Sequence, residues 1–122
     1  MTPSEIITQN IKAAGKNPEP VLKWIATLVK KKQAIILQHG ESVLFLNRIA
    51  PGEAALHLFT NDKPMALMAA LKDFVKKVFA SDLQRVYGKA DTPQILNALR
   101  AVGVKVLDSD KPKYNWMVLT KG

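Results

Sequence analysis

The stretch from Glu53 to Phe79 constrains the fold more than any other part of the chain, because its hydrophobic period changes half-way along. Residues 55–60 alternate with period two, which is typical of a strand. Apolar side chains then recur at spacings of three and four, which predicts one buried helix face: Leu67, Met68, Leu71, Phe74, Val75 and Val78. At the junction, Asn61 or Asp62 is a candidate cap and Pro64 suits the first turn. A strand running directly into a helix exposes amides that can hold a phosphate.

The composition limits the class of protein. A chain of 122 residues, with 48% apolar and 23% charged residues, predicts one globular domain over residues 1–122. The absence of cysteine excludes disulfides, thiolate nucleophiles and cysteine metal sites. No apolar run reaches the roughly 20 residues that cross a bilayer, and the first residues do not resemble a signal peptide. We therefore expect a cytoplasmic protein with no membrane partner.

The net charge of +8 favours acidic partners such as nucleic acid, phosphates, anionic lipid or an acidic protein surface. The candidate nucleic-acid contacts are Lys30, Lys31, Lys32, Lys72, Lys76 and Lys77. The run 30–32 is better explained as a helix end, where cations complement the dipole. Because no recognition motif is present, we expect only salt-sensitive, sequence-blind binding to nucleic acid, and favour an acidic protein partner. The sequence does not predict an oligomeric state.

The chain before the junction predicts two helices and two strands. Thr2 and Glu5 form a capping box that starts the first helix, and Gly15 ends it. A second helix begins after Asn17 and ends in the lysine run. Strands at 33–38 and 42–49 flank a tight turn and are continuously apolar, which predicts a sheet covered on both faces. With the strand that opens at Glu53, they form an antiparallel meander.

The chain after the junction predicts one more helix and three more strands. Thr92 caps the helix and Gly103 ends it. The predicted ranges are strand 82–87, helix 93–102, strand 104–107 and strand 114–119. Two consecutive strand–helix–strand units predict a locally parallel section. The expected fold class is α/β (α+β): a mixed, mostly antiparallel central sheet of about six strands, with helices on both faces.

This order of elements resembles the GNAT superfamily, the acyl-CoA-dependent N-acetyltransferases, over nearly the whole chain. The segment from Thr92 to Val106 is similar to the family's late helix and following strand, and Tyr114–Leu119 is similar to its terminal strand. The chain resembles the small, divergent GNAT-like proteins of tailed phages more than a cellular enzyme. The resemblance implies acetyl-CoA as the cofactor of an active member. It also implies an acyl-CoA loop formed by Asn61, Asp62, Lys63, Pro64, Met65 and Ala66.

The chain departs from the family pattern at this loop. The family has Arg/Gln-x-x-Gly-x-Gly/Ala, whereas Asn61 stands at the first position, Pro64 at the first glycine, and only Ala66 fits. Proline removes an N–H donor, and the charge of Asp62 opposes a diphosphate. Leu99 occupies the position of the tyrosine that often serves as general acid. We therefore predict weak or no CoA binding, and no bound cofactor.

His57 and Glu53 are the candidate catalytic residues, because an imidazole or a carboxylate on this strand lies near the family's acceptor site. Each is better explained as a packed or partly exposed side chain than as a catalytic group. No metal site is predicted. The first hypothesis is a non-catalytic binding or assembly protein, encoded by a phage as a virion component or a contact with the host. The alternative is an acetyl-CoA-dependent N-acetyltransferase, and the third is a non-specific nucleic-acid binder.

Overall fold

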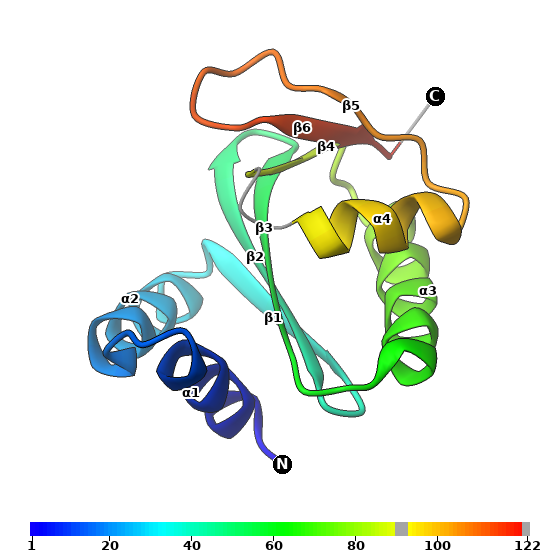
Figure 1. Cartoon of the computed structure of the whole chain (residues 1–122). Helices are drawn as coiled ribbons and strands as arrows, with labels where there is room; N and C mark the ends of the chain where they lie inside the picture. The colour runs from blue at the N-terminus through cyan, green and yellow to red at the C-terminus, as the bar shows by residue number, and fades with distance from the viewer. Residues whose placement is uncertain (90–92, 121–122) are drawn as a thin grey trace.

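A six-stranded sheet lies between two pairs of helices in the computed structural model, which describes residues 1–89 and 93–120 (Figure 1). The strand order is β1-β2-β3-β4-β6-β5. In chain order the elements are α1 (Pro3–Ala13), α2 (Pro18–Lys30), β1 (Ala34–His39), β2 (Ser42–Ala50), β3 (Glu53–Thr60), α3 (Pro64–Ala80), β4 (Arg85–Gly88), α4 (Pro93–Ala101), β5 (Leu107–Asp108) and β6 (Trp116–Leu119). This architecture confirms the predicted fold class.

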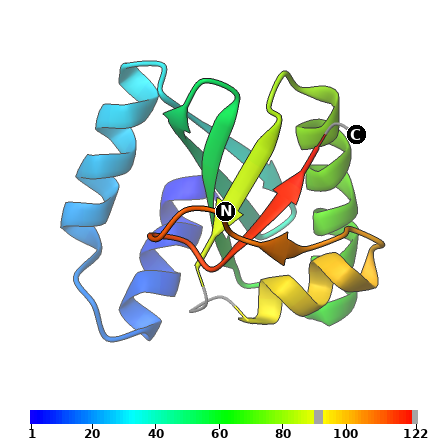
Figure 2. The ribbon, with the colours of Figure 1, turned by 90° about the horizontal axis from the view of Figure 1, so that it is seen from above.

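Helices α1 and α2 cover one face of the sheet (Figure 2). The predicted capping box is confirmed: the Glu5 amide donates to Thr2 Oγ1 at 3.2 Å, and the Thr2 amide donates to Glu5 Oε1 at 3.1 Å. Asn17 caps α2 through the Glu19 amide. The apolar sides of both helices are buried against β1 and β2, which removes this surface from water. The buried residues are Ile6, Ile7, Ile11, Ile25, Ala34, Val43 and Phe45.

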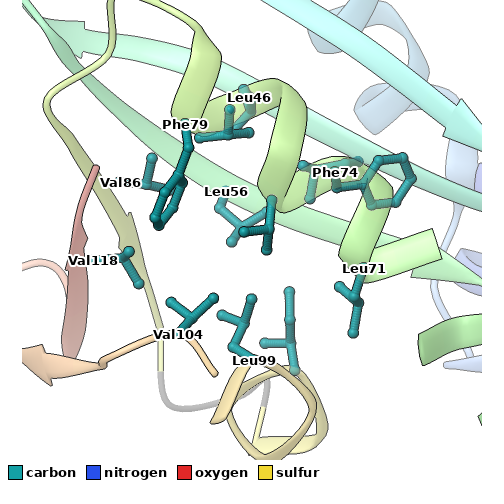
Figure 3. A pocket seen from close by; sticks show the side chains of 13 residues that line it. Leu46, Leu56, Leu71, Phe74, Phe79, Val86, Leu99, Val104 and Val118 are labelled. Atoms are coloured by element: carbon teal, nitrogen blue, oxygen red, sulfur yellow. The ribbon is translucent and has the colours of Figure 1, made fainter. Parts of the chain in front are cut away.

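Helices α3 and α4 cover the opposite face (Figures 1 and 2). Leu99 on α4 is 5% exposed and belongs to the core on this face. Gly103 has φ +90 and ends the helix, as predicted. A cavity of about 40 Å³ remains between these helices and the sheet, lined only by Leu, Ile, Val and Phe side chains (Figure 3). A cavity with such walls stays dry.

The sheet follows the predicted meander over β1, β2 and β3 and then becomes parallel between β3 and β4. Strand β6 lies between β4 and β5 and pairs antiparallel with both, so the second strand–helix–strand unit does not place its strands side by side. Three strands start later than predicted: β4 at Arg85, β5 at Leu107 and β6 at Trp116. Where β4 begins, the amides of Gln84 and Arg85 both donate to the carbonyl of Gly52, in the turn between β2 and β3, so the regular pairing with β3 starts only at Arg85.

Candidate functional site

Strands β3 and β4 run side by side for three residue pairs and then separate. The parallel register ends at Ala55↔Tyr87, whereas β3 continues to Thr60. A pocket of about 210 Å³ opens where they separate; its walls are Leu56, His57, Leu58, Phe59, Gly88, Lys89 and Tyr114. We call it the β3–β4 cleft. Residues 56–59 pair with β2 on their other side, so alternate residues of this stretch direct their amide and carbonyl groups toward the cleft.

Gly88 ends β4 and shapes the cleft. The Trp116 ring occupies the space that a Cβ at position 88 would need, so only glycine fits there. The chain is then held away from β3, because the Trp116 indole donates to the Lys89 carbonyl at 3.1 Å and the Asn115 amide donates to the Gly88 carbonyl at 2.9 Å. Packing of β6 therefore keeps the cleft open.

His57 lines the cleft on the face covered by α1 and α2. Its ring lies 5.7 Å from the Trp24 ring, nearly perpendicular to it, and 5.7 Å from the Phe45 ring. Trp24 is 43% exposed, so this aromatic group forms a wall that solvent reaches. The imidazole is the one titratable ring at the cleft besides the Tyr114 phenol, among the described residues.

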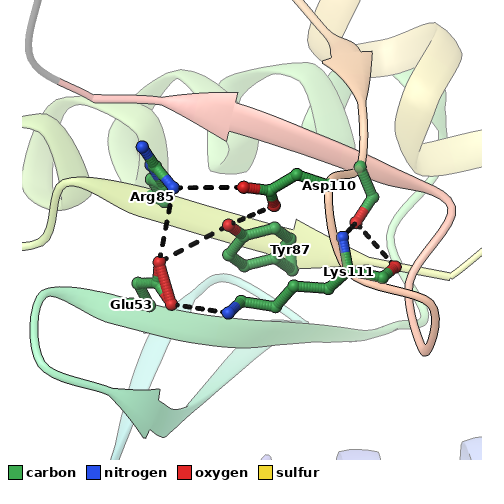
Figure 4. A network of polar contacts seen from close by, with 6 residues as sticks. Glu53, Arg85, Tyr87, Asp110 and Lys111 are labelled. Carbon is green, nitrogen blue, oxygen red and sulfur yellow. Dashed lines mark hydrogen bonds and ion pairs between the residues drawn. The ribbon is translucent and has the colours of Figure 1, made fainter.

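Glu53, the other candidate, lies at the start of the same strand, four residues from His57, which is about 13 Å along a strand. The structure therefore places the two side chains on one face without bringing them together. The Glu53 carboxylate is 13% exposed and is neutralised by Lys111 Nζ at 2.9 Å and a guanidinium nitrogen of Arg85 at 3.7 Å (Figure 4). Both contacts hold the Glu53 side chain against β4 and the β5–β6 loop, away from His57.

Tyr87 and Asp110 complete this network. The Tyr87 hydroxyl donates to Asp110 Oδ1 at 2.8 Å and lies 3.5 Å from Glu53 Oε2 (Figure 4). Burial raises the pKa of Tyr87, while the hydrogen bond from Tyr87 lowers the pKa of Asp110. The hydrogen bond to Glu53 raises the pKa of Lys111. We call Glu53, Arg85, Tyr87, Asp110 and Lys111 the β4 network; it fixes the β5–β6 loop over the sheet.

The prediction that Asn61 or Asp62 caps α3 is wrong. Asn61 exchanges hydrogen bonds with Gln9 and Asn10 of α1. Asp62 accepts from Ser42 Oγ at 2.6 Å and from the Glu41 amide at 3.2 Å. Ser42 is fully buried and needs a partner, which explains why Asp62 turns to the hairpin rather than to the helix.

The first turn of α3 is consequently left without a side-chain cap. Lys63 is the N-cap residue and its side chain makes no capping hydrogen bond. Pro64 has no amide to offer, and Met65 is 89% exposed. The predicted loop 61–66 therefore has two parts. Asn61 and Asp62 hold α1 and the β1–β2 hairpin through hydrogen bonds, whereas residues 63–66 are exposed at the N-terminus of α3.

Comparison with known proteins identifies the architecture. No protein-family model and no curated protein matches the sequence. The structure is similar to that of the Campylobacter jejuni N-acetyltransferase PseH in complex with acetyl coenzyme A, with a TM-score of 0.58 and 14% identity over 97% of this chain and 90% of that one. It is also similar to the IAA acetyltransferase from Bacillus cereus, with a TM-score of 0.54 and 13% identity over 96% and 89% of the two chains. A dodecameric spermidine N-acetyltransferase from Vibrio cholerae aligns with a TM-score of 0.54 and 8% identity over 86% and 75%. The chain has the GNAT fold.

Leu99 stands at the position of the tyrosine that often serves as general acid in the family, and in this chain it is a core residue. Leu99 faces the apolar cavity and does not reach the β3–β4 cleft (Figure 3). Tyr114, which the sequence placed in the last strand, lies just before β6 and supplies a phenol to the cleft instead. Sequence reasoning missed this role, because only the β5–β6 loop brings Tyr114 beside β3.

The structure does not bring the candidate nucleic-acid lysines into one patch. Lys30, Lys31 and Lys32 lie at the end of α2, whereas the other three lie on α3, which covers the opposite face (Figure 1). Lys77 Nζ also forms an ion pair with Asp73 Oδ2 at 2.9 Å.

In the described part of the chain no group of three His, Cys, Asp or Glu residues could hold a metal ion. No helix of residues 1–89 and 93–120 is long and apolar enough to cross a membrane.

Proposed function

We propose that this protein binds an acyl-CoA at the β3–β4 cleft and transfers the acyl group to an amine. The observation that carries the proposal is the separation of two parallel strands after Ala55↔Tyr87, which opens a pocket along the edge of β3. An extended amide-containing chain such as pantetheine can pair with such an edge as an added strand. The likeness to acetyltransferase structures supports the same choice over a non-catalytic role.

The residues at the α3 N-terminus fit the phosphate end of such a ligand in part. Two amides, those of Met65 and Ala66, and the Lys63 ammonium are available to an anion, and Asp62 is turned toward Ser42. Pro64 removes one donor that a glycine would supply. We therefore expect real but weak affinity, determined more by the cleft than by the phosphates.

When bound, an acyl-CoA supplies a thioester carbonyl that is open to attack by a neutral amine. An amine that arrives as an ammonium must first lose a proton, and we assign His57, the imidazole that lines the cleft, to take it. Glu53 is too far along β3 and is paired with Lys111. The CoA thiolate that leaves must gain a proton, and we assign this role to the phenol of Tyr114, which lines the cleft.

Binding and transfer are tested separately. Calorimetric titration with acetyl-CoA should give a saturable heat, and ligand at a hundred times its dissociation constant should stabilise the fold by about 2.7 kcal/mol. In an assay of thiol release with a panel of amines, His57→Gln should lower turnover about a hundredfold. His39→Gln is the matched control, since His39 pairs with Asp73 away from the cleft. Equal loss in both variants, or none in His57→Gln, would reject the role of His57.

A second candidate function is a non-catalytic binding module for a protein with an acidic surface. It is favoured by Pro64 in the loop and by Leu99 buried at the position of the family's tyrosine. The charge of +8 supports an acidic partner. The absence of any heat with both acetyl-CoA and CoA at millimolar concentration would favour this candidate over the transferase.

A further inference from the structure

The two edges of the sheet are unequal. Strand β5 is only two residues long, which leaves little unpaired backbone at that edge. Strand β1 forms the other edge over six residues, and Ala34–Gln38 contains neither charge nor proline. Ile35 on this strand is 50% exposed. Proteins normally protect such an edge with charges, proline or bulges, because unpaired strand backbone recruits another strand.

The two ends of β1 carry opposite charge. Lys30, Lys31 and Lys32 precede the strand, are exposed, and form no ion pair within the described residues. Glu41 and Asp62 lie together after the strand, since the Glu41 amide donates to the Asp62 carboxylate. Neither carboxylate has an ionic partner within residues 1–89 and 93–120. The β1 edge therefore has three lysines before it and the Glu41 and Asp62 carboxylates after it. At the same end His39 is balanced by Asp73, which also pairs with Lys77, and the Gln38 side chain donates to the Met1 carbonyl.

We propose that β1 pairs antiparallel with β1 of a second copy of this chain, forming one continuous sheet across a two-fold axis. Antiparallel pairing places the lysine end of each copy beside the acidic end of the other, twice in each dimer. Parallel pairing would oppose like charges. This surface is self-complementary, which is the requirement of an isologous interface.

The side-chain alternation of β1 also fixes the register. Residues directly opposite each other must point to the same face of the sheet, so the axis passes through a residue and not between two residues. An axis at Ile36 sets Ile35 opposite Leu37, and the lysines that end α2 then lie toward the turn of the other copy that holds Glu41. Strand β2 separates this edge from β3, so the dimer leaves the β3–β4 cleft open.

Sedimentation of the full chain over a range of concentrations tests the proposal. Wild-type protein should show a monomer–dimer equilibrium, and Ile35→Lys should abolish the dimer because it places a charge on the pairing edge. Leu119→Lys is the control: Leu119 is 38% exposed but lies on β6, away from β1. Wild-type protein that stays monomeric, or an Ile35→Lys variant that dimerises as wild type does, overturns the proposal.

A charge exchange tests the antiparallel arrangement. Lys31→Glu and Glu41→Lys should each weaken dimerisation about tenfold or more, because each creates two like-charge contacts. An equimolar mixture of the two variants should dimerise again, because every contact in the mixed dimer joins opposite charges. Melting curves confirm that both variants are folded. A mixture that remains monomeric while wild type dimerises would overturn the antiparallel pairing.

Discussion

The Tyr87 hydroxyl donates a 2.8 Å hydrogen bond to Asp110 Oδ1, and this bond joins the buried strand β4 to the β5–β6 loop. Lys111 of the same loop binds Glu53 on β3 at 2.9 Å. The loop continues to Tyr114, whose ring lies 5.6 Å from that of Tyr87 and lines the β3–β4 cleft. The β4 network therefore positions one wall of the cleft.

Replacing Tyr87 with phenylalanine removes the hydrogen bond and keeps the ring. We expect Tyr87→Phe to lower the free energy of unfolding by about 1 kcal/mol, because Asp110 is half exposed and water replaces the lost donor. Urea denaturation measures the change. Tyr114→Phe removes a hydroxyl from a half-buried ring of the same loop and is the control. If both variants unfold at the same urea concentration as wild type, the hydroxyl does not hold the loop.

The same bond predicts a dependence of stability on pH. The pKa of Asp110 is lowered by the Tyr87 hydrogen bond, so the unfolded chain binds more protons in acid than the folded chain. The contribution of Asp110 is full above its unfolded pKa of about 3.9 and is lost as pH falls through the lower folded value. Asp73, whose pKa is lowered chiefly by its hydrogen bond with Lys77, contributes in the same direction.

Denaturation curves from neutral to acid pH check this prediction. Wild-type stability should fall more steeply below about pH 5 than that of Asp110→Asn, with part of the slope kept by Asp73. Parallel curves for the two proteins would contradict the coupling between Asp110 and Tyr87.

Much of the fold follows from local signals in the sequence. The change of period after Thr60, the Thr2 capping box and the stop at Gly103 each depend on residues a few positions apart, and the structure confirms all three. The errors lie where a distant partner decides. Asn61 does not cap α3 because its side chain bonds to Gln9 and Asn10 of α1, and β4 and β5 are not adjacent because β6 lies between them.

The candidate site was predicted less completely than the fold. His57 lies at the cleft, but the cleft itself depends on Trp116 packing against Gly88, 28 positions earlier in the chain. The pairing of Glu53 with Lys111 joins residues 58 positions apart. Such contacts have no periodic signal in the sequence, so only the topology of the sheet reveals them.

Lys32 occupies a left-handed backbone position with φ +60 just after α2. Its amide and that of Gln33 donate back to the carbonyls of Val29 and Leu28, an arrangement that usually ends in glycine. We expect Lys32→Gly to raise the free energy of unfolding by about 1 kcal/mol by relieving this strain. Lys31→Gly, at φ -79, should instead lower it. If Lys32→Gly melts at a lower temperature than wild type, the backbone at Lys32 is not strained.

The end of α4 gives a further test of packing. Gly103→Val should cost about 1 kcal/mol or more, because a β-branched residue is strained at φ +90. Leu99→Ala should cost about 2–5 kcal/mol, since it enlarges the cavity that Leu99 lines. Leu99→Tyr should also destabilise the fold, because a cavity of about 40 Å³ is too small for the added ring atoms. Near-wild-type stability of both Leu99 variants in chemical denaturation would contradict a filled core.

The central claim is that the β3–β4 cleft holds an acyl-CoA, and amide chemical shifts during an acetyl-CoA titration test it most directly. We predict saturable shifts in residues 56–59, Lys89 and Tyr114, together with smaller shifts in residues 63–66 at the start of α3. CoA without the acyl group should shift the same residues. No shifts up to millimolar acetyl-CoA, or shifts confined to the exposed lysines 30–32, would contradict the claim.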